Sequence, residues 1–208
     1  AKDRGVEKIV ATSTVGALGP PDQSNVQPMD EQHVRLHDFT LDYEASKFQS
    51  DTRMLQYVLQ GMNIVIVYPT RIYGPGSVDR KNGYLWLMKT YLNKGLIAYP
   101  NVGKALSNLV YIDDIVEGHI LAMRNGKAGE KYILGGENAS MDDFLETIFA
   151  ITGKKASRIP LPLWGLRLSA SMMAVVARVN GKQPLLTRKL LEKSKYSWPV
   201  SIEKAKRE

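Results

Sequence analysis

Tyr43 and Lys47 stand four residues apart in the stretch LDYEASKF, residues 41 to 48. On a helix, residues at this spacing lie one turn apart on the same face, so the ammonium group of Lys47 can approach the phenol of Tyr43. A nearby positive charge favours the phenolate and lowers a tyrosine pKa from its usual value of about 10. Such a pair can give a proton to a carbonyl oxygen or take one from an alcohol. The spacing alone also fits two ordinary residues on a helix surface.

Three hydroxyl side chains close the first apolar run of the chain. The run VEKIVATSTV is β-branched and apolar, which predicts a buried strand that ends near Thr14. Open parallel sheets bind their ligands at the carboxyl ends of their strands, which is where Thr12, Ser13 and Thr14 would lie. One of these hydroxyls could hydrogen-bond to the substrate oxygen that Tyr43 protonates. The alternative is that they only satisfy neighbouring backbone groups.

Strand and helix signals alternate through most of the chain. Residues 16–41 are rich in Pro, Asp, Gln and Asn, which predicts a long loop, and residues 42–60 predict a helix that Gly61 ends. The run MNIVIVYP then predicts a strand, followed by a Gly-Pro-Gly turn. Strand, helix and strand at this spacing indicate a βαβ unit of a parallel sheet, and hence an α/β fold.

The second half predicts further elements. GYLWLMKTYLNKG reads as a helix, LIAYP as a strand, and NLVYIDDIVEGHILAM as a strand that runs into a helix with Asp113 or Asp114 as its N-cap. After the strand in EKYILGG, Ser140 and Asp143 approximate a capping box. The alternation fades near Lys154, where we place a domain boundary.

Composition restricts the class of protein. With 44% hydrophobic and 24% charged residues the chain is typical of a globular domain, and the absence of cysteine excludes disulfides and thiolate chemistry. The longest apolar stretch, LPLWGLRLSASMMAVVARV, is broken by proline, glycine and two arginines, so we expect no membrane span. These features favour a cytoplasmic protein. The chain opens at Ala1, inside a predicted element, and gives no information on N-terminal targeting.

The net charge of +7 is uneven along the sequence. Residues 182–208 carry eight Lys and Arg against three Asp and Glu. Apart from Tyr196 and Trp198, this tail lacks the interleaved aromatic residues of a nucleic-acid surface. We therefore expect a solvated helical end and no nucleic-acid partner.

Histidines offer weak evidence for a metal site. His33 and His37 share helical spacing, and Glu31 or His119 could complete a set of ligands. Because both lie in a polar segment with no predicted helix, we expect incidental surface histidines and no metal.

Five ordered stretches carry a family resemblance: ATSTVGALG, YEASK, VYPTRIYGPG, NLVYIDDIVEGHILAM and YILGGENAS. In order and spacing, they resemble the extended short-chain dehydrogenases/reductases over essentially the whole chain. The resemblance implies a Rossmann-type parallel sheet with a smaller C-terminal substrate lobe, and NAD(P)-dependent hydride transfer that sometimes leads to epimerisation or dehydration. Residues 1–153 would be the C-terminal part of the dinucleotide-binding domain with interwoven lobe segments. Residues 154–208 would be mainly lobe and basic tail.

The resemblance also implies roles for individual residues. Tyr43 would be the general acid/base, and Lys47 would lower its pKa and bind the nicotinamide ribose. Thr14 falls on the catalytic serine or threonine of the family. Ser13 and Arg71 are neighbouring candidates for substrate contacts.

The segment after the second strand would face the cofactor, which is NAD or NADP. The backbone at Pro69, Thr70 and Ile72 matches the family stretch that lies against the nicotinamide. Asp114 matches an aspartate that we interpret as structural rather than catalytic.

One part of the family pattern is missing from this sequence. It has no G-x-x-G-x-x-G loop to approach the pyrophosphate, and GALG at residues 16–19 has the wrong context. At ~30 residues per βαβ unit, the absent opening strands amount to very roughly 90 residues. An alternative of another class is therefore an inactive fragment or interaction module with an exposed sheet edge.

The substrate branch is indicated by two substitutions. Arg71 stands where sugar-nucleotide epimerases typically have asparagine, and Ser107 stands where they typically have an arginine that holds a diphosphate. The PTRIYGP turn instead looks like that of dihydroflavonol-4-reductase-like and 3β-hydroxysteroid-dehydrogenase-like members. A nucleotide-sugar epimerase or dehydratase is the alternative.

Apolar residues of the late lobe fit either a less polar substrate or core packing. These residues are Trp164, Leu166, Met172 and Met173.

By analogy with the family, the chain would form a homodimer through a helix pair, for which the helices near residues 43–60 and 83–94 are candidates.

Calorimetric titration separates an enzyme from a module that lacks its cofactor site. If this 208-residue chain acts only as a module, titration with NAD(H) and NADP(H) should show weak or no binding. Micromolar binding of either cofactor would contradict the module.

Overall fold

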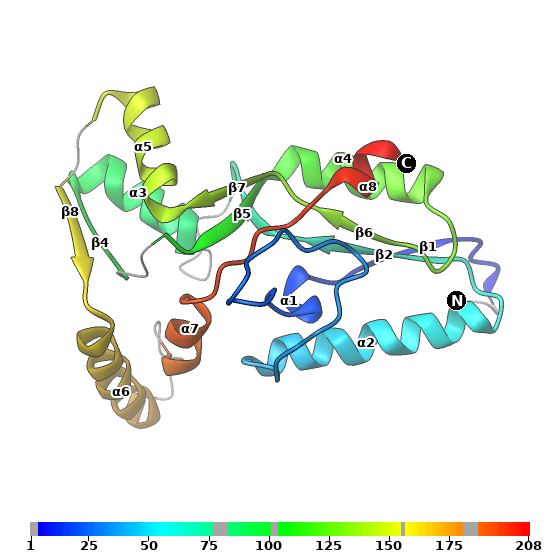
Figure 1. The fold of residues 1–208 in the computed structure, drawn as a ribbon, viewed down its shortest axis with the longest axis horizontal. Helices are drawn as coiled ribbons and strands as arrows, with labels where there is room; N and C mark the ends of the chain where they lie inside the picture. Colours follow the sequence, from blue (N-terminus) through cyan, green and yellow to red (C-terminus); the bar gives the residue numbers. More distant parts are fainter. Residues whose placement is uncertain (1–3, 77–82, 101–103, 155–156, 181–186) are drawn as a thin grey trace. The chain divides into compact units, whose positions relative to one another are not determined.

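The structure is a computed structural model, and its description covers residues 4–76, 83–100, 104–154, 157–180 and 187–208. The chain divides into two compact units, each built from separate segments (Figure 1). Unit 1 comprises residues 1–74, 107–138 and 198–208, and unit 2 comprises residues 75–106 and 139–197.

A parallel three-stranded sheet forms the centre of unit 1. The strands follow the order β1-β2-β6, and α2 connects β1 to β2, so the predicted βαβ unit and α/β fold are confirmed. The register pairs Thr12 with Val67 and Pro69 with Leu134, which brings all three carboxyl ends to one edge. The elements are β1 (Ile9–Thr12), α2 (Asp42–Leu59), β2 (Ile64–Pro69) and β6 (Lys131–Leu134).

Helices cover both faces of this sheet, and successive side chains of β2 point to one face and then to the other. Val65 and Val67 pack in the core with Ile115 of α4 (Ile112–Asn125). Tyr68 faces the other way and hydrogen-bonds to Asp51 of α2. In Figure 1, α2 and α4 lie on opposite sides of the strands. All six residues of β2 are buried, as expected for a central strand covered on both faces.

A second small sheet lies mostly in unit 1. It has the order β3-β5-β7, and β3 runs parallel to β5. α8 contacts β6 at the end of the chain. These elements are β3 (Arg71–Tyr73), β5 (Leu106–Tyr111), β7 (Glu137–Ser140) and α8 (Glu203–Arg207).

Unit 2 pairs a two-stranded parallel sheet with four helices among its described residues. Its core contains Tyr91, Leu145 and Ile148. The predicted capping box is confirmed: Ser140 Oγ accepts from Asp143 N at 3.2 Å, and a carboxylate oxygen of Asp143 accepts from Ser140 N at 2.9 Å. The elements are α3 (Gly83–Lys94), β4 (Leu96–Pro100), α5 (Met141–Thr152), β8 (Ser157–Leu161), α6 (Leu163–Asn180) and α7 (Arg188–Lys193).

Three local predictions were wrong. The N-cap of α4 is Tyr111, and Asp113 and Asp114 lie in the first turn, where carboxylates are favoured by the helix dipole. The segment 16–41 is not all loop, because α1 (Val15–Leu18) begins it. The first strand is not buried as predicted, because three residues of β1 are half-buried and Thr12 is exposed.

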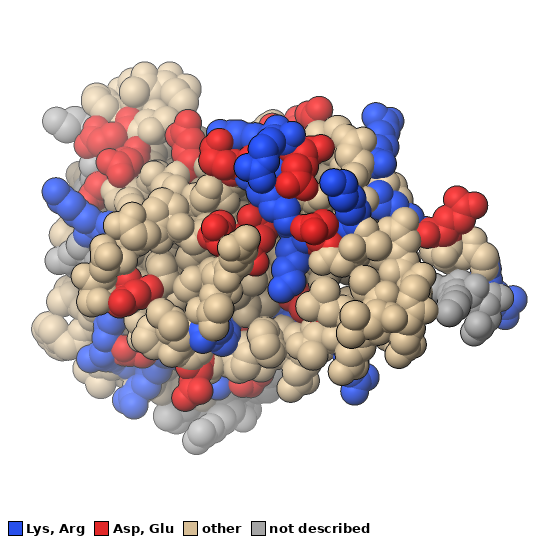
Figure 2. Space-filling view, turned by 45° about the vertical axis from the view of Figure 1, so that its right-hand side comes forward, with Lys and Arg blue, Asp and Glu red and all other residues tan. Residues whose placement is uncertain are grey.

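The charge of the chain follows its two units rather than its tail. Unit 2 has fifteen Lys and Arg against five Asp and Glu, a net charge of +10, whereas unit 1 has thirteen against sixteen, a net charge of −3. Figure 2 shows acidic and basic side chains interspersed on the face in view. Among the described helices, none is long and apolar enough to cross a bilayer.

Truncation in the central strand should destabilise unit 1 strongly. Ile66 is completely buried in β2, so we expect Ile66→Ala to lower the free energy of unfolding by about 2 to 5 kcal/mol in urea titrations followed by circular dichroism. Leu59 at the end of α2 is 89% exposed, and Leu59→Ala should change the free energy of unfolding by less than about 0.5 kcal/mol. Equal losses in the two variants would contradict the assigned core.

Candidate active site at the carboxyl edge of the sheet

One face of α2 is fixed against the end of β1 by two polar contacts. Lys47 Nζ donates to the carbonyl oxygen of Thr12 at 2.8 Å, and Ser13 Oγ donates to Asp51 Oδ2 at 2.7 Å. Tyr43, Lys47 and Asp51 follow one another at intervals of four residues, so they share this face. Tyr43 lies one turn, ~6 Å along the axis, beyond Lys47 and is 57% exposed. Its side chain is therefore open to solvent on the face of α2 that meets the end of β1.

Asp51 is a carboxyl group inside the layer between α2 and the sheet. It is 8% exposed, and burial raises its pKa, although hydrogen bonds from Ser13 and Tyr68 and the charges of Lys131 and Lys47 act in the opposite direction. Burial, together with the charge of Asp51, raises the pKa of Tyr68 far above its usual range. We did not predict Asp51 from the sequence. The available signal was its position two turns after Tyr43.

The three hydroxyls at the end of β1 have three different partners. Thr12 Oγ1 lies 3.0 Å from His119 Nε2, and Ser13 is buried with its proton donated to Asp51. Thr14 is the N-cap of α1 and accepts from Gly16 N at 3.3 Å. Because Thr14 acts here as an acceptor, its own proton is available for a substrate oxygen.

The predicted cofactor segment follows β2 at the same edge. The backbone pairing continues past Thr12, because Ser13 N donates to Val67 O at 2.8 Å, which places the end of β1 beside Pro69. Thr70 N donates to Leu134 O at 3.1 Å. Ile72 belongs to β3 and packs against the core, so only its backbone could face a cofactor.

Asn108 joins this segment to the loop after β6. It is 2% exposed, and its Oδ1 accepts from Thr70 Oγ1 at 2.8 Å and from Gly136 N at 2.9 Å. Its Nδ2 donates to Gly136 O at 3.0 Å and to Asn138 Oδ1 at 2.9 Å. Arg71 lies next to Thr70, half-buried in β3, where it pairs with Leu109 of β5. The sequence signal for Asn108 was a polar residue inside an apolar strand.

Arg35 fixes the loop that leads into α2. Its Nη2 donates to Gly16 O at 2.5 Å, its Nη1 donates to His37 O at 3.1 Å, and its guanidinium lies 4.0 Å from the ring centroid of Phe39. The buried Glu44 accepts from Leu41 N at the start of α2. Arg35 thus fixes the loop before α2, and Glu44 fixes the start of the helix, whose first turn carries Tyr43. Neither Arg35 nor Glu44 was singled out from the sequence.

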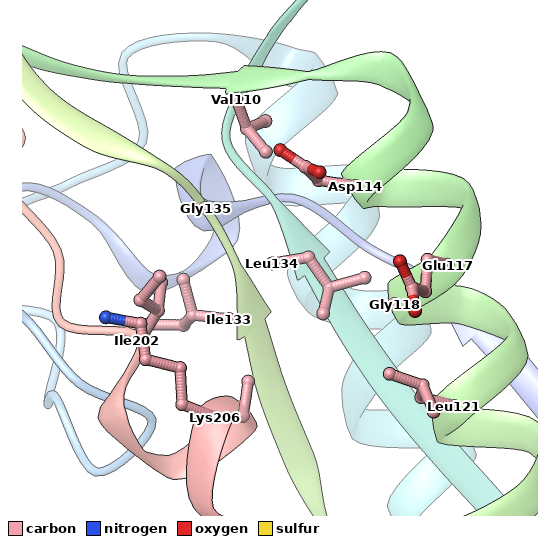
Figure 3. Close-up of a pocket in the computed structure, with 11 residues that line it drawn as sticks. Val110, Asp114, Glu117, Gly118, Leu121, Ile133, Leu134, Gly135, Ile202 and Lys206 are labelled. Atoms are coloured by element: carbon pink, nitrogen blue, oxygen red, sulfur yellow. The ribbon is translucent and has the colours of Figure 1, made fainter.

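A pocket of about 270 Å³ lies elsewhere in unit 1, between α4 and α8. Figure 3 shows Asp114 and Glu117 of α4 on one side, and on the other Lys206 of α8 with Ile202, the residue just before α8. None of the predicted catalytic residues lines it. Asp114 therefore borders this pocket rather than the edge that carries Tyr43.

The histidine set considered for a metal is dispersed. Glu31 accepts from Ile133 N at 2.8 Å, whereas His119 bonds to Thr12 at the end of β1. Burial lowers the pKa of His33. The part of the chain that the structure describes contains no group of three or more residues placed to hold a metal.

Comparison with known proteins identifies the family. Residues 1–135 match the NAD dependent epimerase/dehydratase family, and the chain belongs to it. A "Putative dihydroflavonol 4-reductase" of Synechocystis is 34% identical over 79% of this chain and 48% of its own length. Sterol demethylase protein B of Methylococcus capsulatus is 27% identical over 78% and 48%. The chain thus spans about half the length of these relatives.

Solved structures confirm the Rossmann-type fold. The crystal structure of gox2253 superposes with a TM-score of 0.70 at 32% identity, covering 99% of this chain and 61% of that one. The NAD complex of Thermus thermophilus UDP-glucose 4-epimerase also has a TM-score of 0.70, at 20% identity over 99% and 59%. At that identity the second likeness concerns the fold alone.

Burial of Asp51 predicts an unusual pH dependence of stability. Its pKa is raised above the ordinary 3.8, so its contribution to the free energy of unfolding is fully present below pH 3.8 and is lost as the pH rises through the raised value. We expect the difference between the wild type and Asp51→Asn, measured by urea unfolding at a series of pH values, to fall as the pH rises from 3.8.

Asp22 provides a control of opposite sign. It is exposed, and hydrogen bonds from Ser24 lower its pKa, so the difference between the wild type and Asp22→Asn should rise with pH through the same region. A flat difference for Asp51→Asn would contradict the assigned burial.

Proposed function

We propose that this chain carries the proton-transfer site of an NAD(P)-dependent oxidoreductase that interconverts a carbonyl group and an alcohol. The observation that supports it best is the double attachment of α2 to the end of β1, through Lys47 and Asp51. It fixes the rotation of α2 so that Tyr43 is presented at the carboxyl edge of the sheet, where parallel α/β sheets bind their ligands.

In the proposed reaction, Tyr43 donates its phenolic proton to the carbonyl oxygen, or takes it back in the reverse direction. Thr14 would donate a hydrogen bond to the same oxygen and orient it. Arg71 is a further candidate for a substrate contact. Lys47, one turn along the same face of α2, would bring its positive charge to the same end of the site. Ser13 acts through Asp51 and positions the strand end, because its proton is already donated.

The residues at this edge fit the nicotinamide half of the cofactor. A bound NAD(P)H supplies the hydride that goes to the carbonyl carbon. The ammonium of Lys47 has three donors and uses one in the hydrogen bond to Thr12 O, so two can bind ribose hydroxyls. The backbone at Pro69, Thr70 and Ile72 would lie against the ring.

The substrate that we propose is less polar than a nucleotide sugar. Ser107, where a diphosphate-binding arginine is typical, is a small buried residue in β5. Relatives named as a dihydroflavonol reductase, a sterol demethylase protein and a farnesyl-quinoline-oxide ketoreductase are among the matches. We further propose that unit 2 is the substrate lobe.

Epimerisation or dehydration of a nucleotide sugar is the second candidate. It is favoured by the match to UDP-glucose 4-epimerase of Vibrio cholerae, which is 23% identical over 87% of this chain. The two candidates differ in cofactor balance, because a reductase consumes one NAD(P)H per product whereas an epimerase regenerates its cofactor in each turnover. Absorbance of the reduced nicotinamide therefore separates them.

A module without activity is the third candidate. It is favoured by β1, which pairs with a strand on one side only among the described residues.

Homodimerisation through a helix pair, with α2 and α3 as the candidate helices, and a cytoplasmic location stay predictions.

Replacement of the proposed acid should abolish most turnover in the full-length protein. We expect Tyr43→Phe to lower kcat by about 10²- to 10⁴-fold, because the carbonyl oxygen loses its proton donor. Tyr57→Phe is the matched control, since Tyr57 is an exposed tyrosine on the same helix and should leave kcat unchanged. Cofactor affinity, measured by calorimetry, should persist in both variants. Unchanged turnover by Tyr43→Phe would refute the assignment.

A further inference from the structure

A stripe of large apolar side chains is exposed along α6 in unit 2. Its members are separated by four residues, so they follow one side of the helix, and each is more than half exposed. Core packing therefore does not explain Trp164 and Met172. The stripe consists of Trp164, Leu168, Met172 and Val176.

The opposite side of α6 is the side that packs. At 100° per residue, Ala170 points away from the middle of the stripe, and it is 2% exposed. α6 also contacts α7. A helix that is apolar on its packed side and again on its exposed side differs from an ordinary surface helix, whose outer face is polar. Such an exposed face indicates a binding surface.

Positive charge lies along one side of the stripe. Unit 2 has a net charge of +10, and α7 is rich in cations. Arg188 of α7 donates from Nε to Ser171 Oγ at 3.0 Å, which places a guanidinium beside Met172. Arg167, one residue before Leu168, forms an exposed ion pair with Glu192 at 2.6 Å. Cationic side chains therefore line one side of the apolar stripe on α6.

We propose that α6 docks unit 2 on the surface of an anionic lipid bilayer, lying in the plane of the interface. An apolar face with a tryptophan at its first turn and cations beside it is the arrangement that inserts between headgroups. A net charge of +10 complements anionic headgroups but would oppose the approach of a second copy of the same unit. Nucleic acid matches the charge but offers no apolar surface to the stripe.

Vesicle co-sedimentation of the full chain tests this surface. We expect binding to vesicles of phosphatidylglycerol mixed with phosphatidylcholine, and at least tenfold weaker binding to phosphatidylcholine alone. The double variant Leu168→Gln, Met172→Gln should bind the mixed vesicles at least about tenfold more weakly, because two side chains no longer enter the interface. Ile151→Gln is the matched control, since Ile151 is an exposed apolar residue of the same unit outside the stripe, and it should bind like the wild type.

A second measurement does not depend on the folding of a variant. The emission of Trp164 in the wild type, taken as the difference from Trp164→Phe, should shift to the blue with mixed vesicles and be quenched by brominated acyl chains. The proposal would be overturned if the wild type did not bind the mixed vesicles, or if Ile151→Gln weakened binding as much as the double variant does. It would also be overturned if the double variant bound like the wild type and salt abolished that binding. Light scattering that shows a dimer in the wild type and a monomer in the double variant would overturn it as well, because a second copy would then cover the stripe.

Discussion

The rotational position of α2 on the end of β1 is the constraint on which the candidate site depends. Two consecutive turns of the helix are bonded to two consecutive residues of the strand end, Lys47 to Thr12 and Asp51 to Ser13. A rotation of α2 by one residue, or 100°, would break both contacts and turn Tyr43 away from the edge. The proposed proton-transfer group, Tyr43, is thus oriented by polar contacts one and two turns away from it.

These contacts have a physical cost that apolar residues would avoid. Burial of the Asp51 carboxyl disfavours its charge, which is why its pKa is raised in spite of two hydrogen bonds and two nearby lysines. Unlike an apolar contact, however, a carboxylate that accepts from Ser13 and Tyr68 is directional. Asn108 does the same at the ends of β2 and β6, where its amide joins Thr70 to Gly136. Directional bonds therefore define the shape of the edge, and apolar packing supplies its stability.

The division of charge gives the two units different surfaces. Unit 1 carries the candidate site and is slightly acidic, whereas unit 2 is strongly basic and exposes the stripe on α6. Docking of unit 2 on a bilayer would suit an enzyme whose substrate is less polar than a sugar nucleotide, because such a substrate partitions into lipid. The two proposals rest on different residues and stand or fall separately.

The sequence alone determined most of the helices and strands, and it identified the pair Tyr43 and Lys47. The apolar runs of the strands, the glycine after α2 and the capping box of α5 are local signals, and the order of five motifs singled out Tyr43 and Lys47. Only the tertiary structure decided that Asp51 is buried, that Asn108 joins two strand ends, and that the positive charge collects in unit 2. The physical reason is distance along the chain. Ser13 and Asp51 are 38 residues apart, and no local pattern reveals which acid will meet which hydroxyl once α2 crosses the sheet.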